Sequence, residues 1–342
     1  MCTRRLVGGL VTAAWIALAP ASAAAQRQGT IQERLNRVGA DLFSPQPHPA
    51  EAIAELKAIL AAEPELAEGH MLLGIAYRAQ GSPDLMGEAV AELRQAISLK
   101  PSLTIARLTL ARVYLDMARA SRAREELAIA LGEMPGRPEI LSLLGETERQ
   151  LGNPKRSVDL NRQALQADTT FVQARYYLGL ALMDLGQHAE AITELEMVAQ
   201  SGANPSEAHL GLGTAYLRAG RIDDAVTALR EAARLDPSRS EAHITLARAY
   251  RSKGLYNDAL KELKLATPSI TAASAVYRTI ETDLYMEEGL IRLAQGRLEA
   301  AAESFQRVLA IDANHDAAKR QLAAVRKRLQ NQTVKKKPGE QV

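Results

Sequence analysis

The sequence has a single cysteine, few aromatic residues and little net charge. Its one cysteine, Cys2, excludes an internal disulfide framework and any multi-cysteine zinc or iron–sulfur site. Aromatic residues make up only 4%, so the core has to be built from Ala and Leu, which suits close-packed helices better than an aromatic-rich β fold. The formal net charge is +2, without the basic excess of nucleic-acid-binding domains, and we expect no nucleic-acid partner.

The sequence motifs of common enzyme classes are missing as well. There is no phosphate-binding P-loop, no serine in a nucleophile elbow and no dinucleotide-binding glycine motif. Carboxylates do occur in adjacent pairs, but neighbours on a helix point about 100° apart and do not form an acid–base pair on one face. These pairs are Glu125-Glu126, Asp223-Asp224 and Glu287-Glu288. The sequence therefore predicts a protein that is not an enzyme, with no catalytic residues and no cofactor.

Three of the six histidines, His70, His209 and His243, take the same place in a 34-residue repeat of the chain, near the start of its first helix. Zinc ligands must lie about 2 Å from one ion, whereas packed helix axes are about 8–10 Å apart. We therefore interpret these histidines as packing or hydrogen-bonding residues and predict no metal site. A metal shared by His209 and His243 is the alternative, and it requires both side chains to lean together.

The first residues have the layout of a secretory signal peptide. Arg4 and Arg5 precede an apolar stretch over residues 6–19, and a run of small residues follows. The stretch is short for a membrane span, which needs roughly 20 apolar residues. We expect residues 1–25 to be removed, with cleavage after Ala25 or Ala23, and the protein to be periplasmic or secreted in a bacterium. The alternative is an uncleaved anchor.

A repeat of 34 residues runs through the middle of the chain. The same residue types return at this step in Leu178-Gly179, Leu212-Gly213 and Leu246-Ala247, in Gly186, Gly220 and Gly254, and in Ala191, Ala225 and Ala259. Glycine at the end of a first helix provides a left-handed helix stop, and Gly or Ala elsewhere lets two helices approach closely. This spacing and residue pattern resembles the tetratricopeptide repeat family over almost all of the chain after the signal segment.

The resemblance implies an all-α, right-handed superhelical solenoid of antiparallel helix pairs, stacked into one elongated domain with a C-terminal capping helix. Residues 26–32 are expected to form a linker, and about eight repeat units to fill residues 33–315. The expected unit starts are near residues 33, 67, 104, 138, 172, 206, 240 and 282. The period stretches by eight residues over 267–281, which predicts a longer first helix in the last unit. Residues 316–330 are expected to form the polar capping helix, and residues 331–342, with Lys335, Lys336 and Lys337, a disordered basic tail.

The resemblance also implies that the first helix of each unit lines a concave groove, and this is where we expect a partner to bind. Reading the exposed places of these helices gives a mixed surface that suits a peptide segment better than a polyanion. The candidate residues are Met71, Ile75, Leu108, Arg112, Tyr176, Leu180, Met183, Leu217, Arg248 and Arg251. The Lys and Asn residues of the family's two-carboxylate clamp are absent, so that activity is not expected. The arginines either meet a ligand carboxylate or pair with neighbouring Glu side chains.

We therefore predict a non-catalytic protein–protein interaction scaffold or adaptor of the bacterial periplasm, with a protein or peptide partner in its groove. The alternative is a structural or assembly factor in cell-envelope biogenesis or secretion, which acts through its outer surface or its tail. No membrane span is expected in the mature chain, and a weak contact of the tail lysines with the envelope surface is a further hypothesis.

Overall fold

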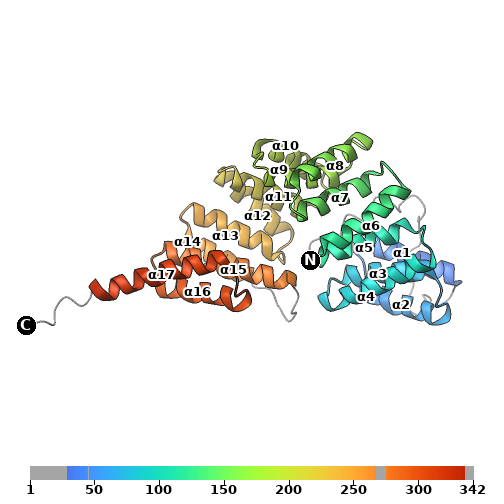
Figure 1. Cartoon of the computed structure of the whole chain (residues 1–342), viewed down its shortest axis with the longest axis horizontal. Helices are drawn as coiled ribbons and strands as arrows, with labels where there is room; N and C mark the ends of the chain where they lie inside the picture. The colour runs from blue at the N-terminus through green and yellow to red at the C-terminus, as the bar shows by residue number, and fades with distance from the viewer. Residues whose placement is uncertain (1–28, 45, 267–274, 336–342) are drawn as a thin grey trace, which may run out of the picture. The chain divides into compact units, whose positions relative to one another are not determined.

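The structure is a computed structural model that describes residues 29–44, 46–266 and 275–335 (Figure 1). The predicted signal peptide, residues 26–28 of the predicted linker and the last seven residues lie outside these ranges. No helix in the described part of the chain is both long enough and apolar enough to span a bilayer.

The described residues form seventeen α-helices and one short 3-10 helix, η2, and no strand. Most of the helices have 12–14 residues, and consecutive helices pack as antiparallel pairs, as the sequence predicts. The helices are α1 Ile31–Leu42, α2 Pro49–Ala62, α3 Ala67–Gln80, η2 Pro83–Leu85, α4 Met86–Leu99, α5 Thr104–Asp116, α6 Ala120–Glu133, α7 Pro138–Gln150, α8 Pro154–Ala167, α9 Val172–Asp184, α10 His188–Gln200, α11 Pro205–Arg218, α12 Ile222–Leu235, α13 Ser240–Ser252, α14 Tyr256–Leu265, α15 Ala275–Ala294, α16 Leu298–Ile311 and α17 Asp316–Lys335.

The described helices divide into two compact units. Unit 1 is Met1–Gln187 and contains α1 to α9; unit 2 is His188–Val342 and contains α10 to α17. The boundary falls in the turn between α9 and α10, a place where the 34-residue pattern shows no change. A local residue pattern reports how helices pair, but it does not report where the chain divides into compact units.

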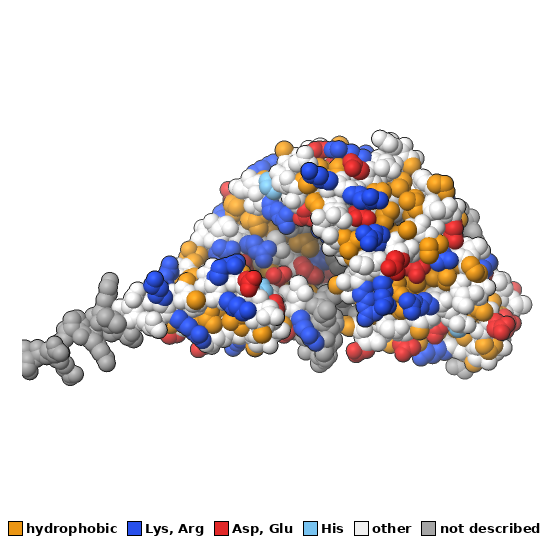
Figure 2. Space-filling model, viewed as in Figure 1, with side chains coloured by type: hydrophobic (Ala, Val, Ile, Leu, Met, Phe, Trp, Pro, Cys, Tyr) orange, Lys and Arg blue, Asp and Glu red, His pale blue; other side chains and the backbone are white. Residues whose placement is uncertain are grey.

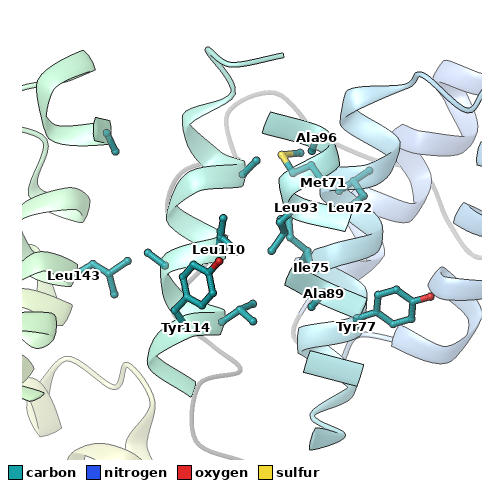
Figure 3. Packing of buried hydrophobic residues seen from close by; sticks show 14 of the residues in the cluster. Met71, Leu72, Ile75, Tyr77, Ala89, Leu93, Ala96, Leu110, Tyr114 and Leu143 are labelled. Atoms are coloured by element: carbon teal, nitrogen blue, oxygen red, sulfur yellow. The ribbon is translucent and has the colours of Figure 1, made fainter. Parts of the chain in front are cut away.

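The core of unit 1 consists almost entirely of aliphatic side chains, with few rings. Leu93 of α4 and Leu110 of α5 face each other across the space between these helices, and both are fully buried (Figure 3). Burying one such leucine contributes roughly 1.5–3 kcal/mol, so an Ala- and Leu-rich stack is stable without many aromatic residues. Close approach of two helices needs glycine, as at Gly74, where a Cβ would lie 2.5 Å from Cγ of Leu93.

From α3 onward, each first helix is followed by a left-handed residue, and in most units this residue is glycine. Gly152, Gly186, Gly220 and Gly254 have φ between 75° and 82°, the conformation that a side chain disfavours. In α5 the same place holds Ala118, with φ 56°. The 34-residue spacing predicts glycine at this helix stop, and Ala118 is an exception to it.

One helix end differs from the sequence prediction, and the length of another helix agrees with it. The capping helix was expected to stop at residue 330, but α17 continues to Lys335, so residues 331–335 are helical and the predicted tail is shorter. The residues that follow Val325 lack proline and glycine until Pro338, which explains why the helix does not stop earlier. The first helix of the last pair, α15, begins at Ala275 and has 20 residues, which is the lengthening that the stretched period indicates.

Candidate functional site

The first helices carry the candidate partner-binding residues, but three of these residues are buried. Met71, Ile75 and Met183 expose 9%, 7% and 5% of their surface, whereas the sequence reading placed them at exposed positions. Met71 and Ile75 belong to the unit 1 core, where α3 is covered on more than one side. The repeat pattern assigns one face of each helix to solvent, and close neighbours cover that face in α3.

Four apolar candidates keep part of their surface. Leu108, Tyr176 and Leu180 in unit 1 and Leu217 in unit 2 are half-buried. The adjacent tyrosines differ in burial: Tyr177 is buried, while Tyr176 is not, and their ring centroids lie 5.8 Å apart at a tilt of 52°. We define the unit 1 face as Leu108 and Arg112 of α5 with Tyr176 and Leu180 of α9.

Arg112 is the charged residue of the unit 1 face, and its environment is unusual. Its Nη2 donates to Oε1 of Gln173 at 3.4 Å, and Nε2 of Gln173 donates to the hydroxyl of Tyr177 at 3.0 Å. No carboxylate in the described residues forms an ion pair with this guanidinium. Burial is the main cause that lowers the pKa of Arg112 below its ordinary value, and the neighbouring Arg78 acts in the same direction.

The nearby carboxylates of unit 1 are engaged by other arginines. Nε of Arg78 donates to Oδ2 of Asp116 at 2.7 Å. Arg149 donates to both oxygens of Glu146, at 2.8 and 3.0 Å, and to Asp184 at 3.0 Å. Arg112 is therefore left as a half-buried cation that is held in position by amide and hydroxyl groups. Such a group favours an anionic ligand, because a carboxylate would replace lost hydration with charge-assisted hydrogen bonds.

The corresponding arginines of unit 2 are neutralised. Arg248 lies 3.4 Å from Oε2 of Glu287, and Arg251 donates to the same carboxylate through Nε and, at 3.5 Å, through Nη2. The Glu287 side chain is only 2% exposed. Of the two roles considered for these arginines, pairing with a neighbouring Glu is the one observed here. Sequence reasoning considered Glu287 only as one of two adjacent carboxylates and missed this cluster.

The recurring histidines are part of a link between the two helices of a pair. Nδ1 of His243 lies 2.8 Å from Oε2 of Glu262, and its Nε2 lies 3.1 Å from the carbonyl oxygen of Pro237. His70 makes the same two contacts with Glu92, at 2.5 Å, and with the Pro64 carbonyl, at 2.8 Å. The hydrogen bond with Glu262 raises the pKa of His243, because a doubly protonated ring donates to both acceptors.

Arginine takes the place of histidine in another unit. Arg107 donates to Glu126 at 3.2 Å and to the Pro101 carbonyl at 3.3 Å. His209 occupies the same place, but the position of the glutamate holds Ala228, and Nδ1 of His209 is buried without a hydrogen-bond partner in the described structure. Histidine and arginine thus act as cross-helix donors. No group of three His, Cys, Asp or Glu within the described ranges has a geometry suited to a metal ion.

Sequence comparison finds matches to family profiles along most of the chain. Profiles described as "Tetratricopeptide repeat" match residues 46–103, 171–208 and 210–275, then 86–147, and finally 282–315. No curated protein sequence matches the chain.

Solved structures are similar in fold at low sequence identity. A tetratricopeptide repeat protein from Parabacteroides merdae has a TM-score of 0.56 and 17% identity, with 76% of this chain and 98% of that chain covered. Cut9–Hcn1, the hetero-tetramer of the APC/C, has a TM-score of 0.62 and 15% identity over 89% of this chain and 57% of that chain. The human IFIT1 dimer with PPP-AAAA has a TM-score of 0.61 and 18% identity over 84% and 74%. At these identities the likeness concerns the fold alone.

Proposed function

The chain belongs to the tetratricopeptide repeat family, and from this we propose that it is a non-catalytic protein–protein interaction scaffold of the bacterial periplasm. A peptide or protein segment binds to the inner side of the first helices. Stacked helix pairs support this function, because they present a long row of side chains on rigid elements.

The observation that carries the proposal is the half-buried Arg112 on the unit 1 face. Its guanidinium has an amide partner and no ion pair among the described residues, and the half-buried Leu108 and Leu180 belong to the same face. A ligand segment with one acidic side chain between apolar ones satisfies both features, since the carboxylate meets Arg112 and the apolar side chains cover the leucines.

Crosslinking of envelope extracts followed by mass spectrometry tests this proposal. The variant Tyr176→Ala/Leu180→Ala truncates two apolar side chains of the unit 1 face and is expected to lose the crosslinked partners. The matched control is Ile129→Ala/Met134→Ala, which truncates two apolar side chains at the other side of a pair, in and beside α6, where they are 47% and 42% exposed. Partner lists that are unchanged in the first variant, or reduced equally in both, contradict the assignment of the face.

The periplasmic location rests on the layout of residues 1–25, with two arginines, an apolar stretch and small residues before the cleavage site. N-terminal sequencing of protein from a fractionated bacterial host tests it directly. We expect a chain that starts at Gln26, or at Ala24 if the peptidase cuts after Ala23, in the periplasmic or extracellular fraction. A chain that starts at Met1 in the cytoplasmic fraction would overturn the location without affecting the scaffold proposal.

A second candidate function is that of an assembly factor for the cell envelope which acts through its outer surface or tail. The feature that favours it is the excess of Lys and Arg near the C-terminus, where residues 316–342 contain eight bases and two acids. A chain that ends after Lys335 removes the residues beyond α17. A crosslinked partner list that changes only in this truncated chain supports the assembly role, and an unchanged list removes the tail from consideration.

A further inference from the structure

The C-terminal helix α17 has an exposed face that is strongly basic. Five cations lie on it within ten residues, and all five side chains are exposed: Lys319, Arg320, Arg326, Lys327 and Arg328. None of the five forms an ion pair with another residue in the described part of the chain. This contrasts with the first helices, where Arg78, Arg149 and Arg251 are each paired with a carboxylate.

The basic face points away from the rest of unit 2. Each residue turns the helix by 100°, which places Ala318, Leu322 and Val325 on one side, and these three are buried, with Leu322 and Val325 packed in the core beside Phe305 of α16. Arg320 and Lys327 are directly opposite that buried side. The five cations span about half of the circumference of the helix, centred on Arg320 and Lys327, and extend about 14 Å along its axis. Blue side chains gather over the part of the molecule where Figure 1 shows α16 and α17 (Figure 2).

The net charge of residues 316–342, which include α17, is opposite in sign to that of residues 26–315. Residues 26–315 contain 32 Lys and Arg against 38 Asp and Glu, while residues 316–342 contain eight against two. A surface of negative charge therefore attracts α17 and repels most of the remaining chain. This asymmetry orients the approach of the protein to such a surface.

We propose that the basic face of α17 docks on anionic phospholipid headgroups and so holds the scaffold at a membrane surface. The face between the cations carries Ala323 and Ala324, which let a flat surface come close. It has no exposed aromatic or large apolar side chain, which the centre of a protein–protein interface usually supplies. It also lacks the aromatic rings on which single-stranded nucleic acids stack. Contact by charge alone is what a headgroup layer offers to a helix whose apolar side is already packed.

Co-sedimentation with vesicles tests the proposal on the protein as isolated from cells. Vesicles of equal parts phosphatidylglycerol and phosphatidylcholine are compared with vesicles of phosphatidylcholine alone. We expect a strong preference for the phosphatidylglycerol vesicles that disappears as salt is raised, because screening shortens the reach of the charges. A protein that shows no such preference overturns the proposal.

Charge variants locate the contact. Arg320→Gln/Lys327→Gln/Arg328→Gln removes three cations from the basic face and keeps good helix formers, and it is expected to lower binding to the anionic vesicles on the order of a hundredfold. The matched control Arg94→Gln/Arg124→Gln/Lys155→Gln removes three exposed cations from unit 1 and is expected to stay within about twofold. Equal losses in the two variants would reject α17 as the docking face.

Two further samples complete the test. Arg320→Lys/Arg328→Lys keeps the charge and is expected to bind like the unchanged protein, because headgroup attraction at a surface depends on charge more than on guanidinium geometry. Single-stranded DNA is offered as a competitor for the vesicles. Tighter binding of the DNA than of the vesicles would overturn the lipid assignment in favour of a nucleic-acid partner.

Discussion

Arg112 in unit 1 and Arg248 in unit 2 occupy the same place in their first helices, eight residues after Thr104 and Ser240. Arg248 shares the buried carboxylate of Glu287 with Arg251, whereas Arg112 contacts the side-chain amide of Gln173. The same residue type at the same repeat position is thus ion-paired in one unit and, among the described residues, has an amide partner and no ion pair in the other. The difference teaches that the partner, and not the arginine, decides the role.

The largest effect is expected when the carboxylate of unit 2 is removed. Glu287→Gln removes the carboxylate with which both Arg248 and Arg251 form ion pairs, and breaking a buried pair of this kind costs about 3 kcal/mol. Urea unfolding monitored by circular dichroism measures the loss. Glu299→Gln in α16 is the control, because this side chain is exposed, and it is expected to change stability by less than about 0.5 kcal/mol. A small loss for Glu287→Gln would show that the cluster is not stabilising.

The same substitution in the two units sharpens the comparison. Arg251→Met removes the closer partner of the Glu287 carboxylate and is expected to cost about 1–2 kcal/mol, because Arg251 is itself partly exposed. Arg112→Met is expected to cost less than about 0.5 kcal/mol, since no buried carboxylate loses a partner. Both are read from urea unfolding curves. Equal costs would mean that Arg112 is as structural as its counterpart.

Two substitutions at helix stops are expected to change the stability in opposite directions. Gly254→Ala in unit 2 places a side chain at φ 75° and is expected to cost about 1 kcal/mol, while Ala118→Gly in unit 1 relieves φ 56° and is expected to gain about half of that. Gly132→Ala, at a helical position of α6 with open space around it, controls for glycine itself and is expected to stabilise. Melting temperatures of the three variants show whether the signs hold.

The link at His243 makes the stability of unit 2 depend on pH. The folded-state pKa of His243 is raised above its ordinary value of 6.5, so the link stabilises fully below that value and is lost as pH rises through the raised pKa. We expect Glu262→Gln to flatten the fall in stability between about pH 6 and 8. Hydrogen exchange of α13 amides at several pH values reports it. Asp258→Asn, on the same helix, should leave the profile as it was, and an unchanged slope in Glu262→Gln would exclude the link as its cause.

The smallest effect is expected from building the missing link of unit 2. His70 in unit 1 has Glu92 as its partner, but His209 faces Ala228 at the corresponding place. Ala228→Glu is expected to stabilise by about 0.5 kcal/mol at a pH where His209 is protonated. Ala228→Gln adds the same length of side chain without the charge and separates packing from pairing. Thermal unfolding that ranks the glutamine variant first would argue against a charge effect.

Much of the fold could be predicted because the repeat is defined by residue types that recur at fixed positions over a short stretch of sequence. The spacing of Leu-Gly pairs, helix-stop glycines and second-helix alanines fixes helix length and pairing, as α11 and α12 illustrate. The extra length of α15 was visible in the stretched period. The extension of α17 to Lys335 was missed because Gln, Asn and Lys read equally well as a tail and as the last turns of a helix.

The candidate site was less predictable, since the position of a residue in the repeat does not reveal how much of its side chain a neighbouring helix buries. Met71 and Met183 look exposed on an isolated helix and are buried in the stack. The partners of the arginines are residues far along the chain. Arg248 donates a hydrogen bond to Glu287, 39 positions away, and Arg112 donates one to Gln173, 61 positions away. No pattern within one repeat contains this information.

The sequence by itself determined the helices, their antiparallel pairing and the family, because helix propensity, helix stops and close-packing alanines act over a few residues. The basic character of α17 was also fixed there, as a simple excess of Lys and Arg. Only the tertiary structure decided which arginines of the chain form ion pairs, which methionines are buried and where the chain divides into two units. Burial and pairing depend on what the neighbouring helices bring within a few ångströms, and that is settled when the helices pack.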